Sequence, residues 1–177
     1  MKVLLACVVW VVPLAIAGSP TDIVINEIMY NPPDDGTGDE LEYVELYNRG
    51  DEDVDIGGWQ FTDGIEFTFP AWTVIEANGY LVVCSDPTAT VEKYLIFNVI
   101  GPFGGRLDNK GDRIAISDDS PDPMLIDEVE YKTGEEWPSE ADGDGPSLEL
   151  VNPSVDNNIG GYWRASYPPE DNGTPGR

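Results

Sequence analysis

The candidate ligand groups of this sequence are carboxylates on glycine-containing loops. Two segments concentrate them, at positions 34–40 (DDGTGDE) and 142–145 (DGDG). Calcium takes about six to eight oxygen ligands, and such loops bend easily around it. A calcium site is therefore one hypothesis, with the candidate ligands Asp34, Asp35, Asp39, Asp142 and Asp144. Neither segment matches the full EF-hand loop pattern, so solvated turns are the alternative interpretation.

Other kinds of catalytic chemistry lack their usual residues. The sequence contains no histidine, which removes the most common general base, the Ser-His-Asp arrangement and the usual zinc ligands. No glycine-rich phosphate-binding motif opens a helix. Among 34 acidic residues some carboxylate pair must have the glycosidase spacing by chance, so such a pair does not indicate an enzyme. We therefore expect a protein that is not an enzyme, with calcium as its one candidate cofactor.

The net charge restricts the classes of partner. Nine basic residues face 34 acidic ones, for a formal net charge of −25. Such a field repels nucleic acid and anionic lipid, and it attracts divalent cations and basic surfaces. Excess carboxylate also keeps a surface hydrated in a salty environment. The composition argues against a nucleic-acid partner.

The first residues have the pattern of a secretory signal. Lys2 precedes an apolar run over positions 3–16, and Ala15 to Ala17 fit the small-x-small cleavage rule. The run is short for a membrane span, and no second apolar segment suggests an anchor. We predict a signal peptide at 1–17 and a secreted, extracellular or cell-surface protein. After cleavage Cys84 is alone, so no intrachain disulfide is expected, and its apolar surroundings predict a buried thiol.

The remaining chain has the pattern of an all-β domain. Short apolar runs separated by Gly, Pro, Asn and Asp predict strands at 22–30, 42–48, 59–62, 65–69, 73–75, 80–84, 113–117, 125–131 and 147–151. About eight or nine short strands with turns between them indicate an antiparallel β-sandwich. We predict one domain at 18–166, with a long irregular connection at 88–110. Residues 167–177 (YPPEDNGTPGR) are predicted to form a flexible tail or linker.

Alternation within the strands predicts which side chains fill the interior. The expected core residues are Val44, Leu46, Trp59, Phe67, Phe69, Val82, Ile114, Ile116, Leu148 and Leu150. Other aromatic residues could line a sugar-binding face or simply cover the core. These are Tyr30, Tyr43, Tyr47, Trp72, Trp137 and Trp163.

The order of short motifs resembles the lamin tail domain family. A strand ending in Asn48 is followed by a turn, a Gly58-Trp59 strand, an F-x-F-P strand at 67–70, and Gly79 before an apolar strand. The Asn26-Glu27-Ile28 triplet is similar to the first strand of secreted bacterial members. Their C-terminal half is resembled by Trp137-Pro138, 143–145, 147–150 and 163–166, and their tail leading into a following segment is resembled by 173–176. Each motif alone is weak, but the ordered series covers nearly all of the chain after position 22.

This resemblance implies an immunoglobulin-like β-sandwich with no shared reaction in its family. It implies a module for protein interaction, adhesion or assembly at the cell surface or in the extracellular matrix. One alternative is a calcium-dependent carbohydrate-binding module, with polysaccharide as partner. Another is an accessory domain of a larger secreted hydrolase or nuclease. Fold alone does not decide among these functions.

Overall fold

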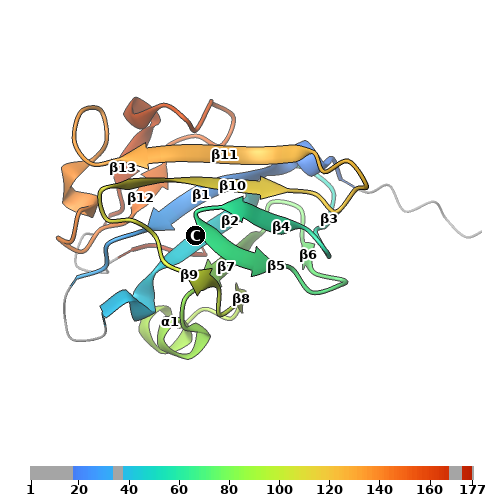
Figure 1. Ribbon diagram of the computed structural model, residues 1–177, viewed down its shortest axis with the longest axis horizontal. Helices are drawn as coiled ribbons and strands as arrows, with labels where there is room; N and C mark the ends of the chain where they lie inside the picture. Colours follow the sequence, from blue (N-terminus) through green and yellow to red (C-terminus); the bar gives the residue numbers. More distant parts are fainter. Residues whose placement is uncertain (1–17, 34–37, 168–172, 177) are drawn as a thin grey trace, which may run out of the picture.

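The computed structural model describes residues 18–33, 38–167 and 173–176, and the side chains of Gly38 and Asp39 are not described. The predicted signal peptide lies outside these residues. Within them, no helix has the length and apolar character needed to cross a membrane. The strands form two facing sheets, as expected for an immunoglobulin-like sandwich (Figure 1).

One sheet has six strands in the order β13-β12-β1-β2-β7-β8. All neighbours are antiparallel except β7 and β8, which are parallel. A register shift between Ile25 and Glu27 in β1 changes which side chains face inward. The strands are β1 (Ile23–Met29), β2 (Tyr43–Asn48), β7 (Tyr80–Cys84), β8 (Val99–Ile100), β12 (Leu148–Leu150) and β13 (Trp163–Ala165).

The other sheet has five strands in the order β11-β10-β4-β5-β9, and β3 and β6 form a separate pair. Gly64, in the left-handed region with φ 82°, connects β4 to β5. These strands are β3 (Val54–Asp55), β4 (Gln60–Asp63), β5 (Ile65–Thr68), β6 (Val74–Ile75), β9 (Gly104–Gly105), β10 (Gly111–Ser117) and β11 (Leu125–Lys132).

Helical segments are short. Asp86 caps α1 (Pro87–Tyr94) by accepting hydrogen bonds from the Thr88 and Ala89 amides, and Pro87 occupies its first turn. Leu95 ends α1 in the left-handed region. The expectation of an irregular connection at 88–110 was therefore wrong, because this segment contains most of α1 and the strands β8 and β9. Four 3-10 helices span Pro20–Asp22, Gly38–Leu41, Ser139–Ala141 and Gly160–Tyr162.

The predicted core side chains lie inside the molecule, with two differences. Phe67 is only partly buried and packs against the main cluster from its edge. Val82 is buried in a second cluster with Met29, Tyr43 and Cys84, on the outer face of the six-stranded sheet. Tyr94 of α1 packs against that cluster, so β1, β2 and β7 are covered on both faces.

The two sheets are joined by a partly buried carboxylate near one edge. Asp127 of β11 accepts hydrogen bonds from the Ile25 amide of β1 (2.7 Å) and from the Asn157 side chain (2.7 Å). Burial raises its pKa to about 6, although these hydrogen bonds act in the opposite direction. This contact ties the edge strand β11 to the facing sheet.

Candidate functional site

The structure describes only some of the predicted calcium ligands. Asp34 and Asp35 lie outside the described residues, and so does the side chain of Asp39. Asp142 and Asp144 are exposed, and Asp142 accepts a hydrogen bond from the side-chain Nδ2 of Asn31 (2.7 Å). In the part of the chain that the structure covers, no three Asp, Glu, His or Cys side chains are placed to hold a metal ion. The calcium site stays a prediction.

The aromatic side chains considered for a sugar-binding face do not share one surface. Tyr30, Tyr43, Trp137 and Trp163 are buried. Tyr47 is partly buried and stacks on Tyr80 with ring centroids 4.6 Å apart. Trp72 is 85% exposed. Burial therefore assigns most of this set to packing.

Glu27 and Glu45 form a site that the sequence analysis did not identify. They lie directly opposite each other on β1 and β2, on the outer face of the six-stranded sheet. Glu149 of β12 is the neighbour of Glu27 on the other side, so three carboxylates form a row across three strands. Glu27 and Glu45 are fully buried, although like charges directly opposite each other are destabilising.

Residues 173–176 cover this row and donate hydrogen bonds to it. The Thr174 amide donates to Glu27 (2.7 Å), and the Gly176 amide donates to Glu45. Gly173, with φ 106°, lies so close to the Tyr43 hydroxyl that a Cβ would come within 2.4 Å of it. Residues 173–175 are buried, so this part of the predicted flexible tail is fixed to the sheet. We call residues 173–176 the C-terminal strap.

Other polar groups complete the site beneath the strap. One oxygen of Glu27 also accepts hydrogen bonds from Tyr43 Oη (2.5 Å) and Ser147 Oγ (2.5 Å). Its second oxygen has no hydrogen-bond partner among the residues that the structure describes. Asn26 donates to Glu45 (2.9 Å).

Burial raises the pKa of both carboxyls. The pKa of Glu45 rises to about 8, with a smaller contribution from the nearby Glu27. Burial also raises the pKa of Glu27, against the effect of its hydrogen bonds from Ser147, Tyr43 and Thr174. Glu45 is therefore mostly protonated at neutral pH. This site is closed by the strap, so its geometry fits a structural fastening rather than the binding of a substrate.

An apolar surface lies at the junction of β6, β7 and β8. Val74 and Phe97 line a groove of about 450 Å³ together with Leu81 and Glu76. Trp72 lies two residues before Val74, and Leu95 lies two residues before Phe97. All four of these apolar side chains are exposed. We call Trp72, Val74, Leu95 and Phe97 the apolar rim.

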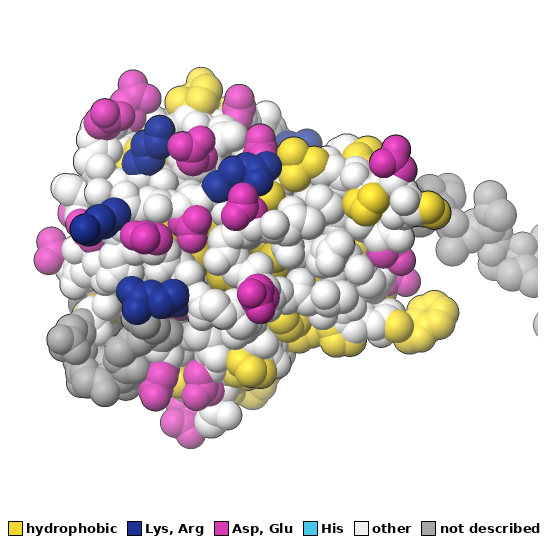
Figure 2. Space-filling model, in the orientation of Figure 1, with side chains coloured by type: hydrophobic (Ala, Val, Ile, Leu, Met, Phe, Trp, Pro, Cys, Tyr) yellow, Lys and Arg dark blue, Asp and Glu magenta, His cyan; other side chains and the backbone are white. Residues whose placement is uncertain are grey.

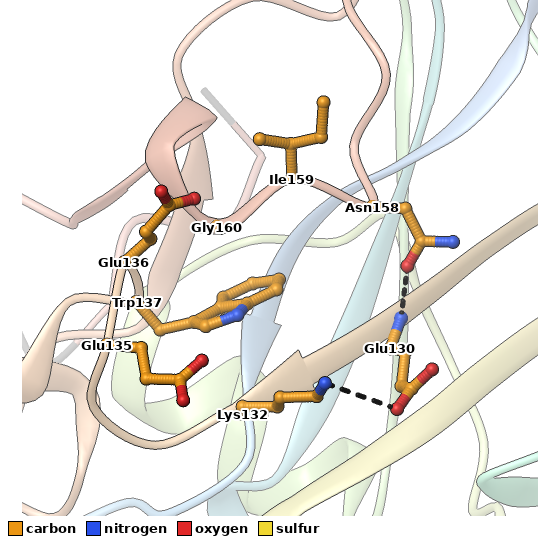
Figure 3. Close-up of a pocket in the computed structure, with 8 residues that line it drawn as sticks. All are labelled: Glu130, Lys132, Glu135, Glu136, Trp137, Asn158, Ile159 and Gly160. Atoms are coloured by element: carbon orange, nitrogen blue, oxygen red, sulfur yellow. Dashed lines mark hydrogen bonds and ion pairs between the residues drawn. The ribbon is translucent and has the colours of Figure 1, made fainter.

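A second hollow lies beside the end of β11 and has a different lining. Its volume is about 610 Å³, and its lining is Glu130, Lys132, Glu135, Glu136, Trp137, Asn158, Ile159 and Gly160. Figure 3 shows these side chains arranged around the edge of the Trp137 indole. The Glu130 amide donates to Asn158 Oδ1 (2.7 Å), and Lys132 lies 3.5 Å from the Glu130 carboxylate. We call this hollow the β11 pocket.

Comparison with known proteins supports the family suggested by the motifs. The Lamin Tail Domain model matches residues 17–133. No curated protein matches the chain. Strands β12 and β13 and the C-terminal strap lie beyond the matched range, but they belong to or cover the same sheet as β1 and β2. The match covers more than half of the chain, and the observed sandwich has the fold expected of the family. This chain belongs to the lamin tail domain family.

Proposed function

We propose that this protein is a secreted, non-enzymatic interaction module that acts in adhesion or assembly at the cell surface or in the extracellular matrix. Membership in a family of immunoglobulin-like modules supports an interaction role in general. The observation that carries the proposal is the apolar rim, of which Val74 and Phe97 line the groove. The partner is a protein that places an apolar segment in the groove between Val74 and Phe97.

Two rim residues have a backbone conformation that costs free energy, and the one at Leu95 also ends α1. Trp72 is 85% exposed and has φ 67°, and Leu95 is exposed with φ 58°. The left-handed region costs a residue other than glycine roughly 1–2 kcal/mol. Neither side chain is buried in return. Strained backbone with an exposed aromatic residue is typical of a binding surface, where such residues supply much of the binding free energy.

The surrounding charge indicates the chemistry of the partner. Glu76 is the one charged residue of the groove lining, whereas the whole chain carries a net charge of −25. Figure 2 shows interspersed acidic and basic side chains over β10 and β11, with more apolar side chains toward the end of the β5–β6 turn. A partner with an apolar anchor and flanking Lys or Arg residues fits this surface, because opposite charge speeds association.

The test is site-directed crosslinking on the surface of the source cells. A photoreactive amino acid at position 97, where the side chain is 88% exposed, is compared with one at the exposed position Val151. We expect a specific protein crosslink from position 97 and none from position 151. The affinity of the identified partner is then measured with purified proteins.

The rim variants separate this proposal from nonspecific adsorption. Trp72→Gly and Phe97→Ser should each weaken binding by at least about tenfold, as for interface hot spots. Val151→Ser is the matched control and should change affinity by less than about twofold. Equal crosslinking from both positions, or equal loss with the control variant, would exclude the apolar rim as the interface.

A further inference from the structure

We propose that the β11 pocket binds a neutral polyhydroxy compound, with a pair of adjacent sugar hydroxyls as the recognised group. This site is separate from the apolar rim and does not depend on the function proposed for it. Its volume of about 610 Å³ lies within the usual range for small-molecule sites. The argument rests on the hydrogen-bonding groups of its lining.

The indole of Trp137 supplies the first of these groups. Trp137 is only 8% exposed as a residue, and its N–H makes no hydrogen bond to the residues that the structure describes; this N–H is not among the enclosed polar atoms that lack a partner, so it is open to the pocket. Figure 3 shows the indole nitrogen on the side of the ring that faces Lys132 and Glu130. The neighbouring Trp163, with its ring centroid 5.9 Å away, instead donates its N–H to the Asn157 carbonyl at 2.7 Å. The Trp137 N–H is therefore a free donor at the pocket wall, and a ligand oxygen fits opposite it.

The other lining groups provide both donors and acceptors close to this N–H. Asn158 uses its carbonyl oxygen to accept from the Glu130 amide, which leaves its amino group as a donor. Lys132 adds an ammonium group, and the carboxylates of Glu130 and Glu135 are acceptors. A hydroxyl group is the common organic group that donates and accepts at one atom. Two adjacent hydroxyls therefore match a lining in which donors and acceptors lie side by side.

The charged groups of the pocket restrict the charge of its ligand. Three carboxylates and one ammonium group line it, which disfavours an anion. A cation placed near the Trp137 N–H would be repelled by that donor and by the Lys132 ammonium. Ile159 is exposed at the pocket wall and offers an apolar contact for the C–H face of a sugar ring.

Gly160 keeps the indole in place. A Cβ at this position would come within 2.9 Å of the Trp137 ring, so no larger residue fits without moving it. Glycine therefore permits the close contact that holds the indole edge toward the pocket.

The test follows the indole N–H signals by two-dimensional ¹H–¹⁵N NMR on protein with ¹⁵N-labelled tryptophan. Glucose, galactose, mannose and xylose are titrated separately to about 100 mM, well above a millimolar dissociation constant. We expect at least one sugar to move the Trp137 indole signal in a saturable manner. The Trp163 signal is the internal control and should stay fixed, because its N–H is already bonded.

Two variants assign the response to the pocket. Glu135→Gln should weaken sugar binding about tenfold, since it replaces a charged acceptor by a neutral one. Glu140→Gln, on an exposed residue outside the lining, should leave binding unchanged. The proposal is overturned if no sugar moves the Trp137 signal. It is also overturned if N-acetylglycinamide moves that signal while the sugars do not, because the site would then recognise amides.

Discussion

At the scale of single residues, two tryptophans illustrate how one residue type serves opposite purposes. Trp59 is 4% exposed and belongs to the main core cluster, whereas Trp72 is 85% exposed on a turn. Gly58, with φ 87°, precedes Trp59 and lets the chain bend so that the ring enters the sandwich. Burial therefore predicts very different consequences for the same substitution.

Replacing Trp59 by Ala should lower the free energy of unfolding by about 3–5 kcal/mol, because it leaves a large cavity. Replacing Trp72 by Ala should change it by no more than about 0.5 kcal/mol, as for other exposed positions. Urea denaturation of both variants measures the two effects. Equal losses of stability would show that the turn carrying Trp72 packs against the fold.

Backbone strain at position 72 leads to a second expectation. Trp72→Gly should raise the free energy of unfolding by about 1 kcal/mol, because glycine adopts a positive φ without the steric penalty, although it also adds freedom to the unfolded chain. The Trp72→Ala variant is the control, since Ala retains the strain. A stability gain together with lost partner binding would show that Trp72 is kept for interaction. A clear loss of stability in Trp72→Gly would contradict this account.

At the scale of elements, the C-terminal strap and the strands β1 and β2 behave as one unit. Two strap amides donate to Glu27 and Glu45, which lie opposite each other beneath it. The strap shields these carboxyls from water, and the carboxyls hold the strap. Stability and protonation are therefore coupled at this place.

The direction of the pH dependence follows from the raised pKa of Glu45. In the unfolded chain Glu45 titrates near its ordinary pKa of 4.5, and in the folded protein near about 8. The folded state holds the proton over this interval, so the stability present below pH 4.5 is lost as the pH rises toward 8. Glu45→Gln removes this titration and should flatten the decline between pH 5 and pH 8. Urea midpoints at several pH values measure both profiles.

A shortened chain separates the strap from the rest of the sheet. Protein ending at Tyr167 leaves Glu27 and Glu45 open to water, so their pKa values should fall toward the ordinary range. We expect this variant to be less stable than the full chain at pH 5 and to have the flatter pH profile. An unchanged profile in the shortened chain would mean that residues 173–176 do not shield the carboxyls.

At the scale of the whole molecule, the excess of negative charge dominates. Some exposed basic residues form ion pairs, such as Arg113 with Asp63 (2.8 Å) and Arg164 with Glu149 (2.5 Å). Exposed pairs of this kind contribute little, typically about 0–1 kcal/mol each. They leave a net charge of −25 on a compact sandwich.

Salt should therefore stabilise the folded protein. Raising sodium chloride from 0.1 M to 1 M shortens the screening length from about 10 Å to about 3 Å, which weakens the repulsion among carboxylates. We expect the melting temperature to rise by several degrees, measured by circular dichroism at pH 7. A fall in melting temperature would show that attractive pairs outweigh the repulsion.

Calcium requires a separate measurement, because any effect of 1 mM calcium on stability would come from binding and not from screening by ionic strength. If the acidic loops bind calcium with a dissociation constant near 10 µM, the stability gain is about 2.7 kcal/mol, or roughly 5–10 °C. Asp142→Asn and Asp144→Asn should remove that gain. The same melting temperature in calcium and in chelator would leave the loops as solvated turns.

Patterns in the sequence were enough to predict the sandwich and most of its core. Period-two alternation in β2 (Tyr43–Asn48) and β10 (Gly111–Ser117) indicates which side chains face the interior of the sandwich, because successive side chains of a strand point to opposite faces of the sheet. The strands β3, β8, β9 and β13 were not predicted. They contain two or three residues each, too few for a period to be visible, and they form because neighbouring strands offer partners.

The burial and protonation of two carboxyl groups follow from the tertiary structure and could not be predicted from local sequence. Glu27 and Glu45 look like ordinary outward-facing strand residues in the sequence, and residues 173–176 look like part of a linker. Contact between these segments, which are 147 residues apart for Glu27 and Thr174, buries both carboxyls and fixes the strap. The same applies to Trp137, whose neighbours in the β11 pocket come from separate segments. Local sequence determines which face a side chain takes on its strand, but burial and protonation depend on what long-range folding places over that face.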